Sequence, residues 1–378
     1  MNPLQKKIVQ RIKKKGPITF KQFMAMALYD PEFGYYKTEP GKIGREGDFY
    51  TSSHLHPVFG AVMGRQIHEM WDLMGQPENF RIVEMGGGAG YFCKDLLGSL
   101  RSVDKFADFF RTLKYTIIER SPAMRNKQQG LLSEFSGKIE WLSALGDCGG
   151  ITGCIFSNEL LDAFPVHLVR MEDDLREIYL DFDEGKGFIE IAGDLSNEEI
   201  LPYFRDFSVE IRKGYITEVN LGIRDWLWEI DEVLSRGFIL TIDYGYPAWD
   251  YYSEDRDRGT ILCYHKHQMN ENPYLNIGEQ DITAHVNYSA LKKWGEDIGI
   301  KTAGFCGQGV FMVSLGIDED IKKIAEGAGD YVFEIARIKK LILPQGLGES
   351  HKVMVQYKGV EEHPELRGFS IRNQIKSL

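Results

Sequence analysis

Cysteine is scarce in this chain of 378 residues, and the positions of the few thiols exclude two kinds of site. The sequence contains no Cys-x-x-Cys pair and no close group of histidines, so neither a disulfide framework nor a zinc site is indicated. We expect no bound metal, and we expect buried free thiols at Cys93, Cys148, Cys154, Cys263 and Cys306.

The chain also lacks an apolar run that approaches the roughly 20 residues needed to cross a bilayer. Its first 15 residues are polar and basic, with apolar side chains at helical spacing, which predicts a short amphipathic helix and not an export signal. No presequence rich in arginine and serine precedes residue 16. We therefore expect a soluble protein of a bacterial cytoplasm, without membrane insertion.

Basic residues are fewer than acidic ones, 45 against 56, which gives a formal net charge of -11. A surface with this balance has no general attraction for a phosphate backbone, so we expect no nucleic acid partner. A protein or a small molecule is the expected substrate. The sequence leaves open whether the chain forms a homodimer. The 43% hydrophobic and 27% charged content is typical of a globular protein.

The most informative segment runs from Phe80 to Gly90, where a short apolar strand meets a glycine turn through the acid Glu84. Glycines at 86, 88 and 90 allow positive φ, and they let the backbone approach a ligand where a Cβ would collide. A helix is expected to follow this turn. The order of strand, glycine turn and helix therefore indicates a site for a nucleoside-bearing cofactor.

Two details select the class of cofactor. The dinucleotide fingerprint requires a glycine at its sixth position, which is Tyr91 when the count begins at Gly86, and no P-loop Gly-Lys-Ser or Gly-Lys-Thr follows. The carboxylate of Glu84 would repel a pyrophosphate but hold an ammonium. S-adenosylmethionine carries an ammonium and no phosphate, so we expect this cofactor at Glu84, Gly86, Gly88 and Gly90. A strand-to-helix turn without a ligand is the alternative.

Apolar strand-like runs recur at helical spacings, which predicts an α/β fold with a doubly wound, seven-stranded parallel sheet. The runs cover residues 82–84, 115–119, 139–142, 153–157, 238–243, 300–305 and 352–357. The rest of the chain is expected to surround this sheet, and insertions at the carboxyl ends of strands should form the substrate side. The expected parts are an N-terminal helical extension with a lid (1–79), a core (80–163, 221–245 and 287–358), two insertions (164–220, with an antiparallel ribbon, and 246–286), and a tail (359–378).

Acids and an amide follow two of the expected strands. Glu119 ends the second strand and could accept both ribose hydroxyls of a nucleoside, or it could be only a helix-capping or surface carboxylate. Asn158 and Glu159 end the fourth strand and should point into the crevice, near the cofactor and the chemistry. Carboxylates such as Glu159 and Asp162 could clamp a guanidinium. The alternative is that Asn158 caps a helix with solvated acids behind it.

Two further segments contain candidate residues. Residues 44–53 combine glycines, an acid, aromatics and hydroxyls, so Asp48 and Thr51 could contact the cofactor from a lid, or the segment could be only a capped loop. His285 precedes an expected helix and is a candidate catalytic residue. A packed or capping histidine is the alternative.

Taken together, these segments resemble the MidA-like family of S-adenosylmethionine-dependent methyltransferases, which includes a mitochondrial protein arginine methyltransferase involved in complex I assembly. The resemblance covers nearly the whole chain and implies a class I methyltransferase (Rossmann-like) fold. It also implies a cofactor held by the Gly86 to Gly90 turn and Glu119, and a substrate crevice near Asn158, Glu159 and His285. Asn287 stands where the family more often has an aspartate. The motifs cover residues 18–20, 29–31, 34–36, 47–52, 84–90, 157–166, 243–245, 281–286 and 308–309.

We therefore predict a methyltransferase that uses S-adenosyl-L-methionine and modifies a protein arginine. One alternative is an assembly or scaffold protein for a respiratory complex partner that retains the cofactor pocket, and the pair of Asn158 and Glu159 weighs against it. An NAD-dependent oxidoreductase is a weaker alternative, because Tyr91 and Glu84 disfavour a dinucleotide.

Overall fold

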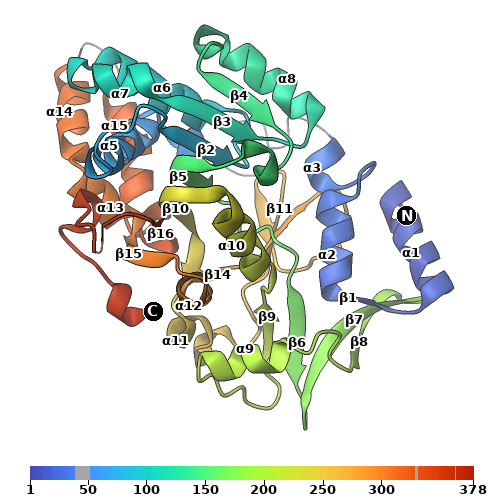
Figure 1. The fold of residues 1–378 in the computed structure, drawn as a ribbon. Coiled ribbons are helices and arrows are strands. Elements are labelled where there is room, and N and C mark those ends of the chain that lie inside the picture. Colours follow the sequence, from blue (N-terminus) through green and yellow to red (C-terminus); the bar gives the residue numbers. More distant parts are fainter. Residues whose placement is uncertain (39–51, 328–330, 362) are drawn as a thin grey trace.

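The computed structural model describes residues 1–38, 52–327, 331–361 and 363–378, and within them the largest sheet has eight strands (Figure 1). Its order is β15-β16-β10-β5-β2-β3-β4, with β14 (Val286–Asn287) paired to the end of β10. The expected seven strands are confirmed. They are β2 (Arg81–Met85), β3 (Lys114–Ile118), β4 (Ile139–Leu142), β5 (Ile151–Asn158), β10 (Leu234–Tyr246), β15 (Lys301–Gly307) and β16 (His351–Lys358).

The direction of one strand differs from the expected all-parallel sheet. β2, β3, β4, β5 and β10 pair in parallel, whereas β16 runs antiparallel to both β10 and β15. The amino-terminal residue of β16 therefore lies at the same edge as the carboxyl ends of the parallel strands. This edge is where a doubly wound sheet binds its ligands.

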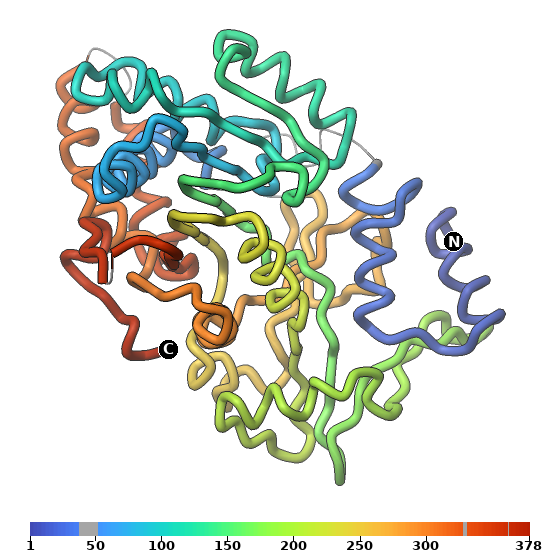
Figure 2. Tube along the Cα trace, viewed as in Figure 1, coloured from blue at the N-terminus to red at the C-terminus, as the bar shows by residue number. Residues whose placement is uncertain are grey.

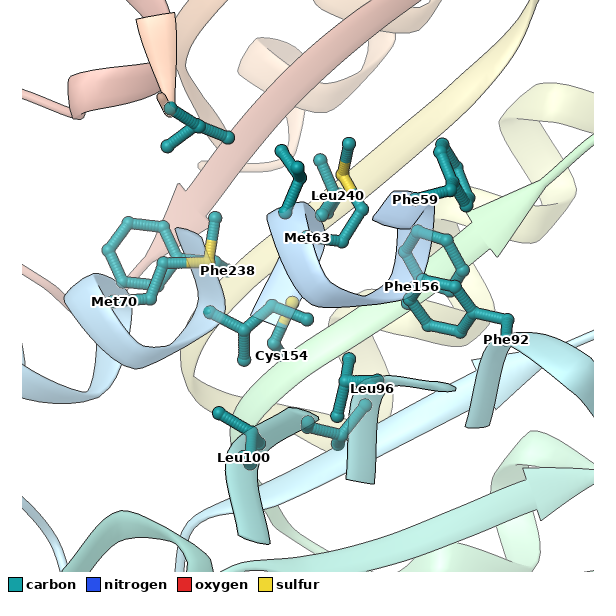
Figure 3. Close-up of a cluster of buried hydrophobic side chains, with 14 of the residues drawn as sticks. Phe59, Met63, Met70, Phe92, Leu96, Leu100, Cys154, Phe156, Phe238 and Leu240 are labelled. Atoms are coloured by element: carbon teal, nitrogen blue, oxygen red, sulfur yellow. The ribbon is translucent and has the colours of Figure 1, made fainter. Parts of the chain in front are cut away.

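Helices cover both faces of the sheet, which explains why its strands are continuous apolar runs. Cys154 and Phe156 of β5 face α5 and α6, and Ile155 between them faces α10 and α12. Figure 3 shows the first of these layers, in which Phe92 stacks on Phe156 with ring centroids 4.0 Å apart. The helices in these layers are α5 (Val58–Leu73), α6 (Tyr91–Ser102), α7 (Ala107–Thr112), α10 (Gly222–Val233), α12 (Tyr288–Asp297) and α13 (Gln308–Ser314).

A second layer lies beside the carboxyl edge of this sheet and combines three parts of the chain. The expected amphipathic helix is confirmed as α1 (Pro3–Lys15), which lies next to α2 (Phe20–Tyr29) in Figures 1 and 2. The expected antiparallel ribbon is confirmed as β7 (Leu175–Asp183) paired with β8 (Gly187–Gly193). The other strands here belong to two separate sheets. β1 (Ile18–Thr19), β6 (His167–Met171) and β9 (Ile216–Val219) join β7 and β8 in a five-stranded sheet, and β11 (Leu262–His265), β12 (Gln268–Asn270) and β13 (Asp281–Thr283) form a three-stranded sheet.

The helices α1 and α2 share one apolar cluster with this second layer, including Ile8, Phe23, Leu180 and Ile282. The five cysteines are buried and free. Among the described residues, none of the helices combines the length and the apolar character needed to span a bilayer. The remaining helices are α3 (Tyr35–Thr38), α4 (Ser52–Leu55), α8 (Pro122–Leu131), α9 (Ile200–Asp206), α11 (Ala248–Tyr251), α14 (Ile317–Glu326), α15 (Tyr331–Ile342) and α16 (Leu347–Ser350).

Candidate functional site

The glycine turn after β2 adopts the backbone conformation that its sequence predicts. Gly86, Gly88 and Gly90 have φ values of +72°, +50° and +90°, which are strained for residues with a side chain. A Cβ on Gly90 would lie 3.3 Å from the Cδ1 atom of Leu132, directly after α8, and 3.5 Å from Cγ of Gln128 in α8, so α8 packs closely there. A Cβ on Gly88 would meet nothing within 4 Å. The turn is therefore closed on the α8 side at Gly90 and open at Gly88.

Glu84 lies beneath this turn. Its side chain is buried, and its Oε2 accepts a hydrogen bond of 2.8 Å from the hydroxyl of Tyr115. A Cβ on Gly87 would lie 3.2 Å from the same oxygen. Burial raises the pKa of Glu84 to about 7, and the hydrogen bond from Tyr115 partly opposes this rise. The carboxylate thus supports the turn from below, and its predicted contact with the cofactor stays a prediction.

Gln128 of α8 connects the turn to Glu119. Its Nε2 donates to the carbonyl oxygen of Gly88 at 2.8 Å and to Oε2 of Glu119 at 3.3 Å, and its Oε1 accepts from the indole of Trp141 at 3.0 Å. Glu119 also accepts a hydrogen bond from the backbone N–H of Ser121 at 2.7 Å. The structure therefore brings Gly88 and Glu119 together. Sequence reasoning missed Gln128, whose only signal is a polar side chain on a predicted helix.

The end of β5 places Asn158 and Glu159 at the same edge. The Nδ2 of Asn158 donates to Oε1 of Glu159 at 3.1 Å, whereas the Oδ1 of Asn158 is buried and has no partner in the described residues. Glu159 has a φ of +51°, an uncommon value for a residue with a side chain. Bends and turns follow, and no helix begins here, so the alternative that Asn158 caps a helix is wrong.

Asp243 at the end of β10 shapes the turn that follows Glu159. One carboxylate oxygen accepts three backbone N–H groups, from Leu160 at 3.1 Å, Leu161 at 2.8 Å and Asp162 at 3.3 Å. The side chain of Asp243 is fully buried, and burial raises its pKa to about 7 against the effect of these hydrogen bonds. The turn that carries Glu159 and Asp162 is therefore held by a second strand of the sheet.

Four carboxylates gather at this edge, and we name them the acidic cluster: Glu159, Asp162, Asp243 and Asp281. Asp162 is 4% exposed and Asp281 is 1% exposed. Burial, followed by the charges of Asp243, Asp281 and Glu159, raises the pKa of Asp162 well above its ordinary value. In the described part of the chain, Glu159, Asp162 and Asp243 form no ion pair with any lysine or arginine. Such a cluster favours the entry of a cation.

Tyrosines of the N-terminal extension reach this cluster from the second layer. The hydroxyl of Tyr36 donates to Oδ1 of Asp281 at 2.8 Å, and the hydroxyl of Tyr29 donates to the carbonyl oxygen of Ala163 at 2.9 Å. From the insertion, Tyr264 has its pKa raised to about 12 by burial and by the charges of Asp162, Glu159 and Asp281. The extension and the insertion therefore build one wall of the site.

His285 lies farther along the same edge, between aromatic rings. It is parallel to the ring of Tyr244 at a centroid distance of 6.0 Å, and its backbone N–H donates to Oγ1 of Thr260 at 3.0 Å. Burial, with Arg256 and His351 nearby, lowers the pKa of His285 to about 4. Its Nδ1 has no hydrogen-bond partner in the described residues. No direct bond joins His285 to Glu159 in that part of the chain, and its predicted catalytic role stays a prediction.

A different histidine lies next to Glu159. His351, the first residue of β16, is fully buried, and its Nε2 is 3.5 Å from Oε1 of Glu159. Its ring lies 4.0 Å from that of Tyr244, and its Nδ1 is 3.2 Å from Oγ of the half-buried Ser350. Sequence reasoning missed His351, because a parallel last strand would have placed it at the opposite edge.

The predicted cofactor contacts Asp48 and Thr51 lie outside the described residues. The next residue, Ser52, begins α4, and its backbone N–H donates to Oε1 of Glu159 at 3.2 Å. Its hydroxyl donates to Oε1 of the fully buried Gln308 at 3.1 Å. The start of α4 is therefore attached to the site at Glu159.

Comparison with known proteins adds to this geometry. A family model described as "Putative S-adenosyl-L-methionine-dependent methyltransferase" matches residues 62–306. The chain is 24% identical to the mitochondrial "Protein arginine methyltransferase NDUFAF7 homolog" of Drosophila melanogaster, over 94% of this chain and 85% of that protein. It is 26% identical to the mitochondrial "Protein arginine methyltransferase NDUFAF7" of Homo sapiens, over 87% of this chain and 77% of that protein.

A solved structure resembles the whole chain. It is that of a protein from Burkholderia thailandensis bound to S-adenosyl-homocysteine, with 27% sequence identity and a TM-score of 0.89. The superposition covers 99% of this chain and 96% of that one.

Proposed function

Because this chain belongs to the family of S-adenosyl-L-methionine-dependent methyltransferases whose model matches residues 62–306, we propose that its methyl acceptor is an arginine side chain of a protein. The chain has the class I methyltransferase fold, and its cofactor is S-adenosyl-L-methionine. The names of the fly and human relatives support a protein arginine for this chain.

The acidic cluster is the observation that carries the proposal. A buried carboxylate without a counter-ion is costly, and a cation that enters such a site is favoured by every charge around it. Glu159, Asp162 and Asp243 have no lysine or arginine partner in the described part of the chain, so a guanidinium from a substrate would supply the missing charge. A planar guanidinium also matches carboxylates through paired hydrogen bonds.

The residues at the turn fit the cofactor. Beside Gly88 there is open space for the cofactor, which a Cβ at this position would partly fill. The buried Oδ1 of Asn158 has no hydrogen-bond partner among the described residues. We assign Glu119, held beside Gly88 by Gln128, to the ribose hydroxyls. When bound, the cofactor supplies an electrophilic methyl group. Asn158 ends β5, which pairs with the strand that leads into the turn, and it donates a hydrogen bond to Glu159.

The carboxylates have separate tasks in this proposal. Glu159 and Asp162 hold the guanidinium and orient one of its nitrogens, which is the main requirement of a displacement reaction. Asp243 fixes the turn that carries both residues and is a positioning residue. The guanidinium has a pKa above about 12, so its proton leaves only as the nitrogen is methylated. We assign the Glu159 carboxylate as the acceptor of that proton, and Nε2 of His351 lies 3.5 Å from its Oε1.

The Glu159→Gln variant tests this proposal. With labelled cofactor and host-cell protein, the wild-type chain should label protein, and the variant should lose about 100-fold or more of that transfer. Calorimetry with S-adenosylhomocysteine should give similar affinities for both, because the change removes a charge at the acceptor side only. Unchanged transfer by Glu159→Gln would remove this residue from the mechanism, and no transfer to protein by the wild type would contradict the proposed acceptor.

Partner capture, measured separately with the same two proteins, distinguishes an enzyme from the assembly or scaffold alternative. A scaffold would capture its partner equally well with Glu159 or Gln at this position and would transfer no methyl group. The relatives are named as mitochondrial proteins, and for this chain a bacterial cytoplasmic location stays a prediction.

A further inference from the structure

The helices α1 and α2 lie side by side, away from the main sheet (Figures 1 and 2). A basic groove lies between them. It has a volume of about 530 Å³, and none of the residues that line it is acidic. Positions 7, 11, 14 and 15 of α1 share one helix face, so their side chains form a single stripe. The main lining residues are Lys7, Arg11, Lys14 and Lys15 of α1 with Gln22 and Met26 of α2.

Most of this positive charge is not neutralised within the chain. Lys7 forms an ion pair with Asp30 at 2.7 Å, but Arg11, Lys14 and Lys15 form none in the described residues. Basic residues in the last turn of a helix favour its dipole, which explains Lys14 and Lys15 in part. That effect does not reach Lys7 and Arg11, which lie earlier in α1. The groove is therefore a concentrated positive site on a chain whose net charge is -11.

One face of α2 connects this groove to the acidic cluster. Gln22, Ala25 and Met26 line the groove, and Tyr29 follows at the next position of the same helical stripe. Tyr29 is 40% exposed, and its hydroxyl donates to the carbonyl oxygen of Ala163, the residue after Asp162. Seven residues of helix rise about 10 Å, so a short extended peptide could span both sites.

We propose that this groove, defined by Lys7, Arg11, Lys14 and Lys15, binds an acidic segment of the protein substrate while the target arginine occupies the acidic cluster. The inference rests on the proposed function. Two sites of opposite charge fix the direction and register of the bound peptide, because a reversed peptide would bring like charges together. A long polyanion is disfavoured, because Asp30 and Glu32 lie at one end of the groove and Glu184 pairs with Lys13 nearby.

The test measures binding and does not require methyl transfer. A fluorescein-labelled oligo-aspartate peptide is titrated with the full chain at low salt, and fluorescence anisotropy gives its Kd. The double variant Arg11→Glu/Lys14→Glu should raise this Kd about tenfold or more. The matched control is Lys6→Glu/Lys13→Glu, which makes the same charge change on α1 outside the groove and should leave the Kd within about threefold of wild type. Thermal unfolding checks that both variants fold.

Several results would overturn the inference. They are an absence of peptide binding by the wild type, an equal loss in both double variants, and tighter binding of a single-stranded RNA oligonucleotide or of anionic phosphatidylserine vesicles at the same residues. A second probe tests the connection to the site. An arginine joined to the oligo-aspartate by a flexible linker should bind about tenfold more tightly than oligo-aspartate alone.

Asp162→Asn should remove that gain and leave oligo-aspartate binding unchanged. If the gain is absent in the wild type, the groove does not serve the acceptor site. If the protein labels a residue other than arginine, the proposed function fails, whereas the oligo-aspartate Kd still reports on the groove. The two failures are thus distinguishable.

Discussion

Glu159 combines an uncommon backbone conformation with three polar neighbours. Its φ is +51°, and its Oε1 lies near the backbone N–H of Ser52, the amide of Asn158 and the ring of His351. Backbone strain of this kind costs about 1 to 3 kcal/mol and persists where surrounding contacts impose it. Here the hydrogen bond from the N–H of Glu159 to the carbonyl oxygen of Ile242 contributes to that constraint. The position of this carboxylate is therefore fixed before a substrate arrives.

For the two histidines at the edge of the sheet, we predict different effects of substitution on methyl transfer. His351 is 3.5 Å from Glu159, whereas His285 is held between tyrosine rings. We expect His351→Gln to lower kcat about tenfold or more with little change in KM, because it removes the ring that lies beside Glu159, the proposed proton acceptor. His285→Gln should have the smaller effect. If His285→Gln abolishes methyl transfer and His351→Gln does not, the catalytic role belongs to His285.

The raised pKa of Glu84 predicts that the free energy of unfolding depends on pH. Its pKa in the folded protein is about 7 against an ordinary value of 4.5, so the folded state binds the proton more tightly. The stability from this proton is complete below about pH 4.5 and is lost as the pH rises through about 7. Glu84→Gln keeps an acceptor for Tyr115 but has no charge, so its free energy of unfolding should exceed that of wild type by about 3 kcal/mol at pH 8 and by little near pH 4.5.

Chemical denaturation of both proteins across this pH range measures the difference. Asp243 also has a raised pKa, but it is present in both proteins and cancels in the comparison. A stability difference that does not change with pH would contradict the assignment. S-adenosylhomocysteine affinity is a second readout, and weaker binding by Glu84→Gln would support the predicted contact with the cofactor.

At the scale of elements, a Gly→Ala substitution in the glycine turn can be compared with a control Gly→Ala substitution in the helix that follows it. Gly88→Ala places a methyl group on the open side of the turn at a φ of +50°, which costs about 1 to 2 kcal/mol and fills space assigned to the cofactor. We expect its S-adenosylhomocysteine affinity to fall about tenfold or more. Gly98→Ala, in the middle of α6, meets nothing within 4 Å, so it should stabilise the chain by about 0.5 to 1 kcal/mol and leave affinity unchanged. Wild-type affinity in Gly88→Ala would place the cofactor elsewhere.

The strands were predictable because each is an apolar run between polar turns, and α1 was predictable from its spacing of Leu4, Ile8 and Ile12. The antiparallel direction of β16 was not predictable from the sequence. Direction depends on which strands pair after a connection of more than 40 residues, and no local pattern records it. This one feature places His351 at the ligand edge, so the missed strand direction and the missed residue have the same cause.

At the scale of the whole molecule, the acidic cluster forms only when distant segments meet. Glu159 comes from the core sheet, Asp281 from the insertion 246–286, and Tyr29 and Tyr36 from the N-terminal extension. The sequence indicated Glu159 and Asp162 because both follow one strand. It could not join Asp281 to them, since Asp281 comes from an insertion more than 100 residues farther along the chain. The charge pattern of the whole chain is likewise uneven, with a basic α1 on an acidic protein.

The identity of the labelled residue tests the central claim most directly. The wild-type chain is incubated with deuterated-methyl S-adenosylmethionine and host-cell protein, the protein is hydrolysed to amino acids, and the products are identified by mass spectrometry. We predict deuterated methylarginine, at a level that falls about 100-fold with Glu159→Gln. Label on another amino acid, or label confined to small molecules, would contradict a protein arginine as the acceptor held by the acidic cluster.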